Sequence, residues 1–434
     1  MNRQPFAMPP QSWEPKMTPW FARAWFPMVR REMRNKADIQ NVDLHGLEHL
    51  QSAVATGAGV LITPNHSFHY DSYVLGHAAH EVARPFHVMA AWQVFHAATS
   101  FQRFIMQRNG IFSIDRESAD LGAFKRAVEI LRSHHCPLVI FPEGDIYHTN
   151  DRVSSFREGA AAIALSAAKR SDRPTIILPA AIKCRYVTDP TPGLLDLMSR
   201  LEESLHWRPH THLPLPERIY RFAGELLALK ELEYLGRHQT GTVPSRTAAL
   251  IGHLLDEQEQ RHNLEKRTGT VPERVKELRR HHIERLSSGE GKPWSEGEAW
   301  REGEAPAEPS AVRAPHDSAA PQERRPPTAR PKLDEATRQQ LERDMEDLFF
   351  VIQLYSYPGD YVAEKPSIER IAETLDKFEE DVLRVRYPTP RGTRHATVRF
   401  GEPIALANEK ASREAIAALT TQLEQRVQAL LDQT

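Results

Sequence analysis

Apolar and polar residues alternate in short blocks between residues 58 and 184, and this pattern predicts strands and helices in turn. The apolar runs are brief, rich in β-branched residues and bounded by Gly or Pro, which is typical of buried strands. The predicted strands are 58–63, 86–90, 111–114, 138–142 and 176–183. Helical spacing between them is clearest at 118–133 and in the alanine-rich stretch 156–169. The alternation predicts an α/β fold, with helices flanking a mostly parallel sheet.

Apolar residues repeat at helical spacing in three later stretches. These are 193–286, 334–356 and 367–386. Residues 395–404 then predict one more strand and a turn, and an amphipathic helix follows. We expect this last strand to join the sheet that begins at residue 58. In that arrangement, residues 190–390 are a large helical insertion into one α/β domain.

Residues 287–333 contain almost no large aliphatic side chains. Such a segment buries too little apolar area to offset the entropy of ordering, so we predict a disordered linker. The expected division of the chain follows from these patterns. It comprises an N-terminal segment (1–44), the first part of the core (45–190), two helical parts of the insertion (191–286 and 334–390) on either side of the linker (287–333), and the last core strand with the terminal helix (391–434).

Residues 12–34 combine aromatic side chains with arginines, and Pro27 interrupts them. Trp and Phe beside Arg is the composition of an interfacial membrane anchor, with the rings at the acyl boundary and the cations at the headgroups. The same aromatics would also suit a helix that packs over the core. Both interpretations stay open.

Charge and cysteine content narrow the class of protein. A net charge of −2 over 434 residues argues against a nucleic-acid partner. Cys136 and Cys184 lie in apolar strand-like runs, which predicts buried thiols in a reducing compartment. No secretory signal and no apolar run long enough to span a bilayer is visible. We expect a cytoplasmic protein, soluble or peripheral at the inner face of the cytoplasmic membrane.

A polar turn follows the first predicted strand and carries Asn65, His66 and, five positions after the histidine, Asp71. An imidazole titrates near neutrality and can take a proton from a hydroxyl, and a nearby carboxylate would fix its tautomer. This requires His66 in the turn and Asp71 in the first turn of the next helix. Two other readings exist: a helix-capping Asp beside a solvated His, and a metal site formed by His66, His69 and Asp71.

Four ordered blocks of sequence resemble those of the glycerolipid acyltransferase family, typified by bacterial 1-acylglycerol-3-phosphate acyltransferases with their HX4D motif. The blocks are Asn65-His66-x4-Asp71, Gly110 to Arg116, Phe141-Pro142-Glu143-Gly144, and Leu178-Pro179-Ala-Ala-Ile182. The final strand, Val398 to Ile404, is also similar to the last strand of the family. The resemblance covers about 45–190 and 395–434 and leaves the insertion unexplained.

The resemblance implies a glycerol-3-phosphate acyltransferase-like fold and direct transfer of a fatty acyl chain from a thioester, acyl-CoA or acyl carrier protein, to a lysolipid hydroxyl. His66 would be the general base and Asp71 would orient it. Arg116 would bind the acceptor head group, as a guanidinium binds phosphate. The remaining substrate-binding residues implied are Asn65, Gly110, Phe141, Pro142, Glu143, Gly144 and Pro179. The family's reaction needs no cofactor and no metal.

The third block departs from the family, because it continues with Asp145 where an arginine-containing turn is usual. A carboxylate there would weaken phosphate binding, although Arg116, Arg152 or Arg157 could supply cations. The acceptor is therefore expected to differ from lysophosphatidic acid. Two alternatives of other classes remain: a non-catalytic lipid-binding or scaffold protein, and a metal-dependent hydrolase. The insertion would suit a lid, a membrane-contact surface or an oligomer interface.

Overall fold

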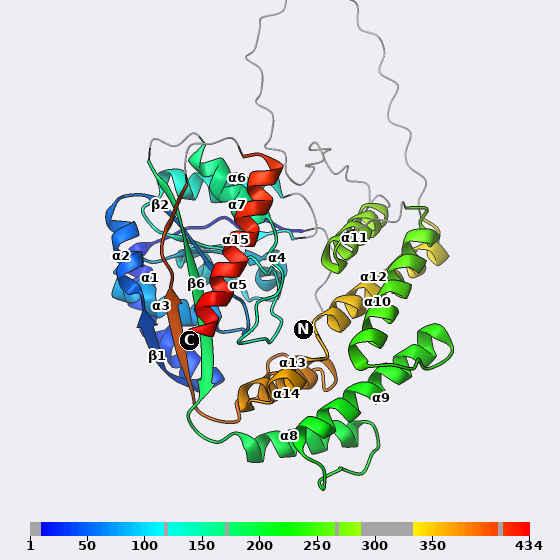
Figure 1. Cartoon of the computed structure of the whole chain (residues 1–434). Coiled ribbons are helices and arrows are strands. Elements are labelled where there is room, and N and C mark those ends of the chain that lie inside the picture. The colour runs from blue at the N-terminus through cyan, green and yellow to red at the C-terminus, as the bar shows by residue number, and fades with distance from the viewer. Residues whose placement is uncertain (1–9, 117–119, 170–172, 265–268, 288–332, 407–410) are drawn as a thin grey trace, which may run out of the picture.

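The chain folds into two parts, a sheet covered by helices and a group of helices beside it (Figure 1). The computed structural model describes residues 10–116, 120–169, 173–264, 269–287, 333–406 and 411–434. The predicted linker at 287–333 lies outside the described residues except for its two ends. The sheet is built from residues before 187 and after 393, and the helical group comes from the residues between them.

Within the described residues, eight strands form one sheet in the order β1-β7-β6-β2-β5-β3-β4, with β8 beside β6. The strands are β1 (Ile39–His45), β2 (Gly59–Pro64), β3 (His87–Ala91), β4 (Ile111–Ile114), β5 (Leu138–Val139), β6 (Thr175–Tyr186), β7 (Arg394–Phe400) and β8 (Ile404–Leu406). From β6 to β4 every neighbouring pair is parallel, whereas β7 and β8 run antiparallel to β6. The mostly parallel sheet is thus confirmed, and β7 joins it as expected.

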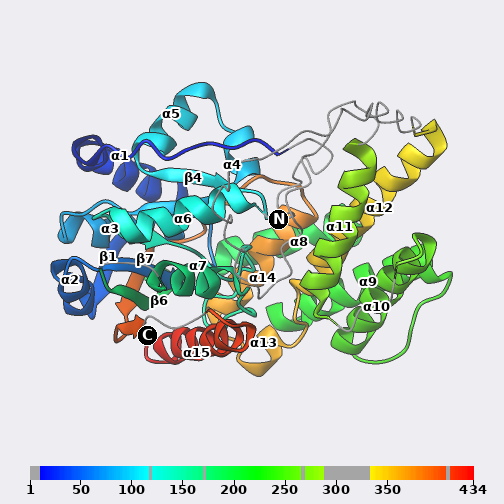
Figure 2. The ribbon, with the colours of Figure 1, turned by 90° about the horizontal axis from the view of Figure 1, so that it is seen from above.

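Helices cover both faces of the sheet (Figure 2). They are α1 (Pro19–Ala37), α2 (Leu47–Ala55), α3 (Asp71–Glu81), α4 (Trp92–His96), α5 (Ser100–Arg108), α6 (Leu121–Ser133), α7 (Gly159–Ala168) and α15 (Arg413–Asp432). Val60 and Ile62 of β2 pack in a cluster with α1, α2 and α3, whereas Leu61 packs in a second cluster with α6, α7 and α15. Successive strand residues face opposite sides, so an all-apolar strand needs both layers. Each fully buried aliphatic side chain contributes about 1.5–3 kcal/mol.

Two strands differ from the sequence prediction for local reasons. β5 was predicted at 138–142 but ends at Val139, because a turn follows in which the Gly144 N–H donates to the Phe141 carbonyl at 3.1 Å. β1 was not predicted, because most of its residues face solvent and few are apolar. It lies at the edge of the sheet and pairs with β7. An edge strand buries little apolar area, so its sequence carries a weak signal.

The insertion leaves the sheet after β6 and returns at β7. Its helices are α8 (Thr191–Ser204), α9 (Leu215–Leu235), α10 (Val243–Arg261), α11 (Val271–Ser287), α12 (Glu335–Tyr355), α13 (Tyr361–Glu364) and α14 (Ile368–Asp381). They bury two apolar clusters of their own, one around α8, α9 and α14 and one around α10, α11 and α12. The two ends of the insertion meet where the Val187 N–H donates to the Thr393 carbonyl at 2.9 Å.

The N-terminal aromatic segment forms α1, with Pro27 inside the helix. Phe26 and Met33 are buried against the core, as a packed helix requires. The opposite side of α1 meets α5 in an aromatic patch that reaches the surface. This aromatic patch consists of Trp20, Phe21, Trp25, Phe101 and Phe104. Its outermost members, Trp20 and Phe101, are 67% and 65% exposed.

Candidate active site

The turn after β2 is fixed to the neighbouring strand by Asn65. Its side-chain amide donates to the carbonyl of Ile182 at 3.0 Å, and its Oδ1 accepts from the Ile182 N–H at 2.7 Å. Asn65 is buried, so both hydrogen bonds are shielded from water. The amide thus takes the place of a ladder partner where β2 ends, and it sets the position of the residue that follows.

His66 lies in this turn and Asp71 begins α3, as the five-residue spacing requires. The Nδ1 of His66 lies 2.9 Å from Oδ2 of Asp71, which also accepts the Phe68 N–H at 2.9 Å. An ionised carboxylate can only accept, so the imidazole hydrogen is on Nδ1 and Nε2 keeps its lone pair. Asp71 is fully buried, and its Oδ1 has no hydrogen-bond partner among the described residues. The pair has the geometry of an oriented general base.

Glu143 lies beneath the same turn. Its Oε1 accepts the backbone N–H of His66 at 2.6 Å, and its Oε2 accepts the backbone N–H of Ser154 at 2.9 Å. Burial raises the pKa of Glu143 to about 8, although these two N–H groups oppose the shift. Glu143 is 2% exposed. Its position indicates that it holds the backbone of His66, whereas Asp71 contacts the imidazole.

The rest of the third block shapes one side of His66. The Phe141 ring stacks on the His66 imidazole, with centroids 4.1 Å apart and planes 26° apart. Gly144 has φ of 75°, and a Cβ added there would lie 2.5 Å from Nε of Arg157. Glycine is favoured on both counts, and its lack of a side chain lets the backbone and Arg157 approach closely beside the turn. The Pro142 carbonyl accepts the Arg157 N–H at 2.8 Å, which fixes the start of that arginine.

Arg116, from the turn after β4, reaches the third block. Its NH1 donates to the Gly144 carbonyl and lies 3.6 Å from Oδ2 of Asp145. Burial raises the pKa of Asp145, but the guanidinium groups of Arg116 and Arg157 overcome it, so the pKa lies below its ordinary value. The carboxylate that departs from the family pattern therefore neutralises the cations nearest to it.

The comparison with known families bears on this arrangement. A family model described as Acyltransferase matches residues 41–183. This segment is an acyltransferase-family domain. No curated protein matches the sequence. The matched residues include His66, Asp71 and Glu143 and end near the last residues of β6, so the helical insertion lies outside the match.

The acyltransferase domain places most of the predicted site residues at the end of the sheet where its parallel strands terminate. Asn65, Glu143 and Arg116 follow β2, β5 and β4, and the carboxyl ends of these strands lie together because the strands are parallel. Pro179 pairs with Thr63 near the end of β2 and is buried. Gly110 is different. It precedes β4 and therefore lies at the amino ends of the strands, where its carbonyl lies 3.3 Å from Nδ1 of His87. Its position favours a turn role and does not support the predicted contact with substrate.

His69 does not join His66 and Asp71 as the metal interpretation requires. Its Nε2 lies 2.7 Å from Oε1 of Glu380 on α14, and Nε2 of His148 lies 3.5 Å from the same oxygen. All three side chains are largely buried. Sequence reasoning missed His148 and Glu380. Nothing local marks Glu380, which stands 311 positions from His69.

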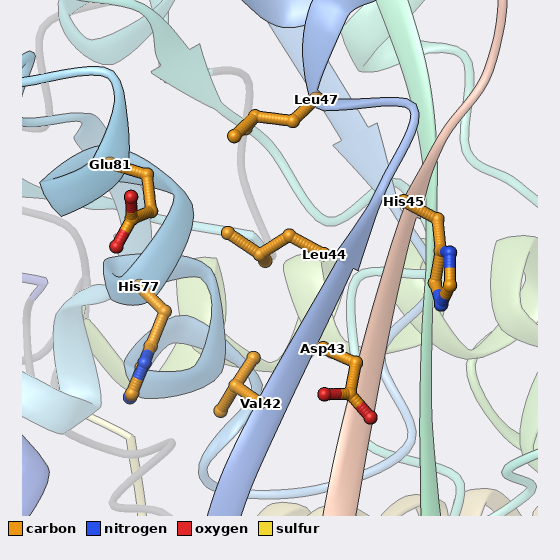
Figure 3. A pocket seen from close by; sticks show the side chains of 7 residues that line it. All are labelled: Val42, Asp43, Leu44, His45, Leu47, His77 and Glu81. Carbon is orange, nitrogen blue, oxygen red and sulfur yellow. The ribbon is translucent and has the colours of Figure 1, made fainter.

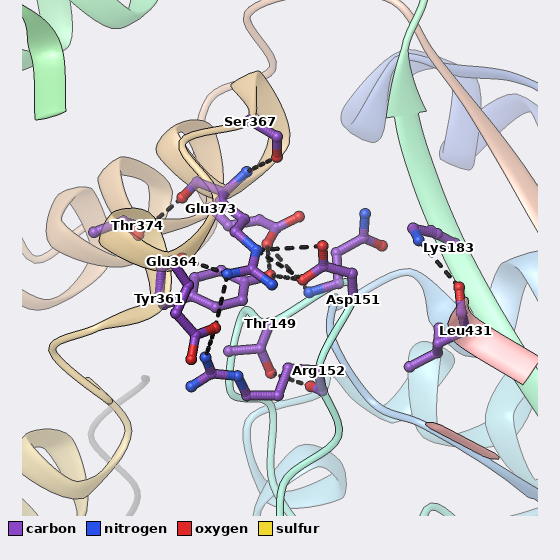
Figure 4. A network of polar contacts seen from close by, with 12 residues as sticks. Thr149, Asp151, Arg152, Lys183, Tyr361, Glu364, Ser367, Glu373, Thr374 and Leu431 are labelled. Atoms are coloured by element: carbon purple, nitrogen blue, oxygen red, sulfur yellow. Dashed lines mark hydrogen bonds and ion pairs between the residues drawn. The ribbon is translucent and has the colours of Figure 1, made fainter. Parts of the chain in front are cut away.

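A second polar network ties the insertion to the acyltransferase domain (Figure 4). Asp151, in the loop after the third block, accepts from Arg370 at 3.0 Å. The Tyr361 hydroxyl lies 3.0 Å from Oδ1 of Asp151 and 2.6 Å from Oε2 of Glu373 on α14, which also accepts the Asn150 N–H at 3.1 Å. The insertion therefore fixes the loop that leads away from Glu143. Arg152 pairs with Asp360 and Glu364 of the insertion, so it is not directed at a head group.

A surface hollow lies elsewhere in the domain, between β1 and α3 (Figure 3). Leu44, His77 and Glu81 are among its lining residues, and none of the predicted site residues is. Burial and nearby arginines lower the pKa of His77 to about 4.

Among the described residues, no helix is both long and apolar enough to cross a membrane.

Proposed function

We propose that the chain transfers a fatty acyl group from a thioester, acyl-CoA or acyl carrier protein, to the hydroxyl of a lysophospholipid- or glycerol-phosphate-type acceptor. The observation that carries this proposal is the contact of Nδ1 of His66 with Asp71, which leaves Nε2 as a base. The family match at residues 41–183 supports acyl transfer in general terms. The donor, the acceptor and the role of each residue are part of the proposal.

The reaction follows from the oriented imidazole. Nε2 of His66 accepts the proton of the acceptor hydroxyl while its oxygen attacks the thioester carbonyl, so a C–O bond forms. The tetrahedral intermediate collapses with cleavage of the C–S bond, and the leaving thiolate takes the proton back from Nε2. Asp71 stabilises the imidazolium between the two steps. The proton removed from the hydroxyl ends on the leaving thiol, so the reaction needs no cofactor.

The charges near Gly144 favour an acceptor other than lysophosphatidic acid. Arg116 is already paired with Asp145, and Arg157 lies beside the same carboxylate. A phosphomonoester would have to compete with Asp145 for these cations and would meet its negative charge. A lysolipid with a less anionic head group, or a lipid that offers a hydroxyl or amine, fits this environment better.

The aromatic patch on α1 and α5 supports peripheral binding at a membrane. Trp20 and Phe101 present large apolar rings to solvent, and Arg23 and Arg30 of α1 are exposed. Aromatic rings with adjacent cations suit the interface of an anionic bilayer. A lysolipid acceptor resides in such a bilayer, so the patch would bring the domain to its substrate.

Thiol release from long-chain acyl-CoA, with and without a mixture of lysolipids, tests the function. We expect acceptor-dependent release by the purified full chain, reduced about 100- to 10,000-fold in His66→Ala. His253→Ala, on the exposed side of α10, is the control and should match the wild type. If acyl-CoA gives no release, acyl carrier protein is tested as donor. Failure with both donors, in folded protein, would contradict acyl transfer.

A further inference from the structure

Three histidines of the insertion lie together where α10 meets α11. His262 directly follows α10, and His281 and His282 are consecutive residues of α11. One nitrogen from each imidazole lies within 4.8 Å of the others. The ring centroids of His262 and His282 are 4.5 Å apart, and those of His262 and His281 are 5.4 Å apart. α10, α11 and α12 lie beside one another, apart from the sheet (Figures 1 and 2).

Two of these imidazoles bury a nitrogen that makes no hydrogen bond. Nδ1 of His282 and Nε2 of His281 have no partner among the described residues, and the His282 side chain is fully buried. A buried polar atom without a partner is destabilising, so such atoms require an explanation. An imidazole nitrogen with an available lone pair is what a metal ion needs as a ligand.

Neighbouring side chains fix the tautomers of the other nitrogens. Nε2 of His262 lies 2.7 Å from Oδ2 of Asp344, a buried carboxylate on α12. Nε2 of His282 lies 3.1 Å from Oε1 of Gln258 on α10. Both oxygens accept, so the hydrogens are on Nε2 and the lone pairs are on Nδ1 of each ring. A carboxylate or amide behind a ligating imidazole is the usual outer support of a metal site.

We propose that His262, His281 and His282 form a binding site for a divalent transition metal ion, with Zn²⁺ as the ion that three imidazoles suit best. Three neutral nitrogens and a water molecule complete a tetrahedral shell. The ion would tie the end of α10 to α11 and, through Asp344, to α12. This site belongs to the insertion and is independent of the function proposed for His66.

One cation competes with the metal. NH1 of Arg285 donates to Nδ1 of His262 at 3.3 Å, the nitrogen that would ligate the ion. Arg285 lies near the end of α11 and is partly exposed, so its side chain can leave the site without breaking the helix. Removal of this guanidinium should strengthen metal binding, because it abolishes both the competing hydrogen bond and the like charge.

The test is the zinc content and zinc affinity of the purified full chain. After removal of metals with a chelator, titration with Zn²⁺ should give one equivalent bound and a rise in Tm with zinc concentration. We expect His281→Ala and His282→Ala to lose this binding. Asp344→Asn should weaken it about 10- to 100-fold, and Arg285→Ala should strengthen it. His253→Ala, an exposed histidine of α10, should bind as the wild type does.

A measurement on the wild type alone tests the proposal if a substitution prevents folding, and it uses Co²⁺ as the probe. Co²⁺ bound to the wild type should show the strong visible absorption of a tetrahedral site, and added Zn²⁺ should displace it. Less than one equivalent of tightly bound zinc in the wild type would overturn the proposal. So would zinc that survives in folded His281→Ala but is lost in His148→Ala, because it would then sit at His69, His148 and Glu380.

Discussion

Oε1 of Glu380 in the insertion lies 2.7 Å from Nε2 of His69, inside the loop that joins His66 to Asp71. The carboxylate is buried, and a second histidine, His148, lies beside it. The insertion thus contributes a charged group to the loop that carries the proposed base. A change in α14 reaches His66 through this contact without touching substrate.

We expect Glu380→Gln to lower stability at neutral pH by about 1–3 kcal/mol, because it removes a buried charge from two histidines. It should also lower kcat more than it changes KM, since the His66 loop shifts while the acceptor site stays. Denaturant titration and steady-state kinetics measure both effects. Glu335→Gln, an exposed change on α12, is the control.

The same variant has a predicted pH signature. Burial opposes ionisation of Glu380, but His148 and His69 outweigh it and hold its pKa below the ordinary value of 4.5. A lowered pKa contributes stability that is present above pH 4.5 and lost as the pH falls. The stability difference between the wild type and Glu380→Gln should therefore shrink under acid conditions. A constant difference would contradict the assigned contact.

Glu143 predicts the opposite dependence on pH. Its pKa is raised from 4.5 to about 8 by burial, so the neutral form is favoured in the folded state. The stability it contributes is complete below pH 4.5 and is lost as the pH rises through about 8. Glu143→Gln does not titrate. Relative to the wild type, its stability should improve between about pH 5 and about pH 9 in denaturant titrations, and a parallel pair of curves would refute this.

Asp145→Asn should shift acceptor preference towards phosphate. Without its carboxylate partner, Arg116 can pair with a phosphomonoester, and the repulsion disappears. We expect the kcat/KM for lysophosphatidic acid, relative to that for a neutral monoacylglycerol, to rise about tenfold, which corresponds to about 1.4 kcal/mol. Asp196→Asn, an exposed change on α8, is the control. An unchanged ratio, or a wild type that already prefers lysophosphatidic acid, would argue against the assigned role of Asp145.

The aromatic patch predicts binding to anionic vesicles. Replacing Trp20 and Phe101 together with alanine removes two exposed rings, and we expect vesicle affinity to fall at least about tenfold. Co-sedimentation with vesicles measures it. Leu229 and Leu232 on α9 are 54% and 49% exposed, and their double replacement is the matched control. Equal loss in both variants would indicate non-specific apolar contact and not a docking patch.

Sequence reasoning anticipated the local geometry around His66. The structure adds that parallel strands place their carboxyl ends together, which brings the turns that carry His66, Arg116 and Glu143 to one end of the sheet. The spacing of His66 and Asp71 required the helix start that α3 provides. Gly110 was assigned to the site by resemblance, but it precedes β4 and so lies at the opposite end of the strands from His66.

What escaped prediction depends on contacts between distant segments. Glu380 lies in a helix rich in acidic residues, a pattern that usually marks a solvated face, yet here the helix packs against the domain and buries them. His262 is also separated in sequence from His281 and His282, and their common position depends on how α10 and α11 pack. Neither arrangement has a local signature, because tertiary packing decides which polar side chains are buried.

The pairing of β6 with β7 explains how the sheet accommodates a long insertion. Tyr186 pairs with Arg394, so the whole insertion occupies the place of a hairpin turn between two antiparallel neighbours. The entropy of closing a connection rises only with the logarithm of its length, about 0.6 kcal/mol for each doubling. The stability of the sheet therefore depends little on the length of the connection between β6 and β7. A short turn could replace the insertion with the same strand register. A chain trimmed in this way would keep its strands and lose the carboxylate beside His69.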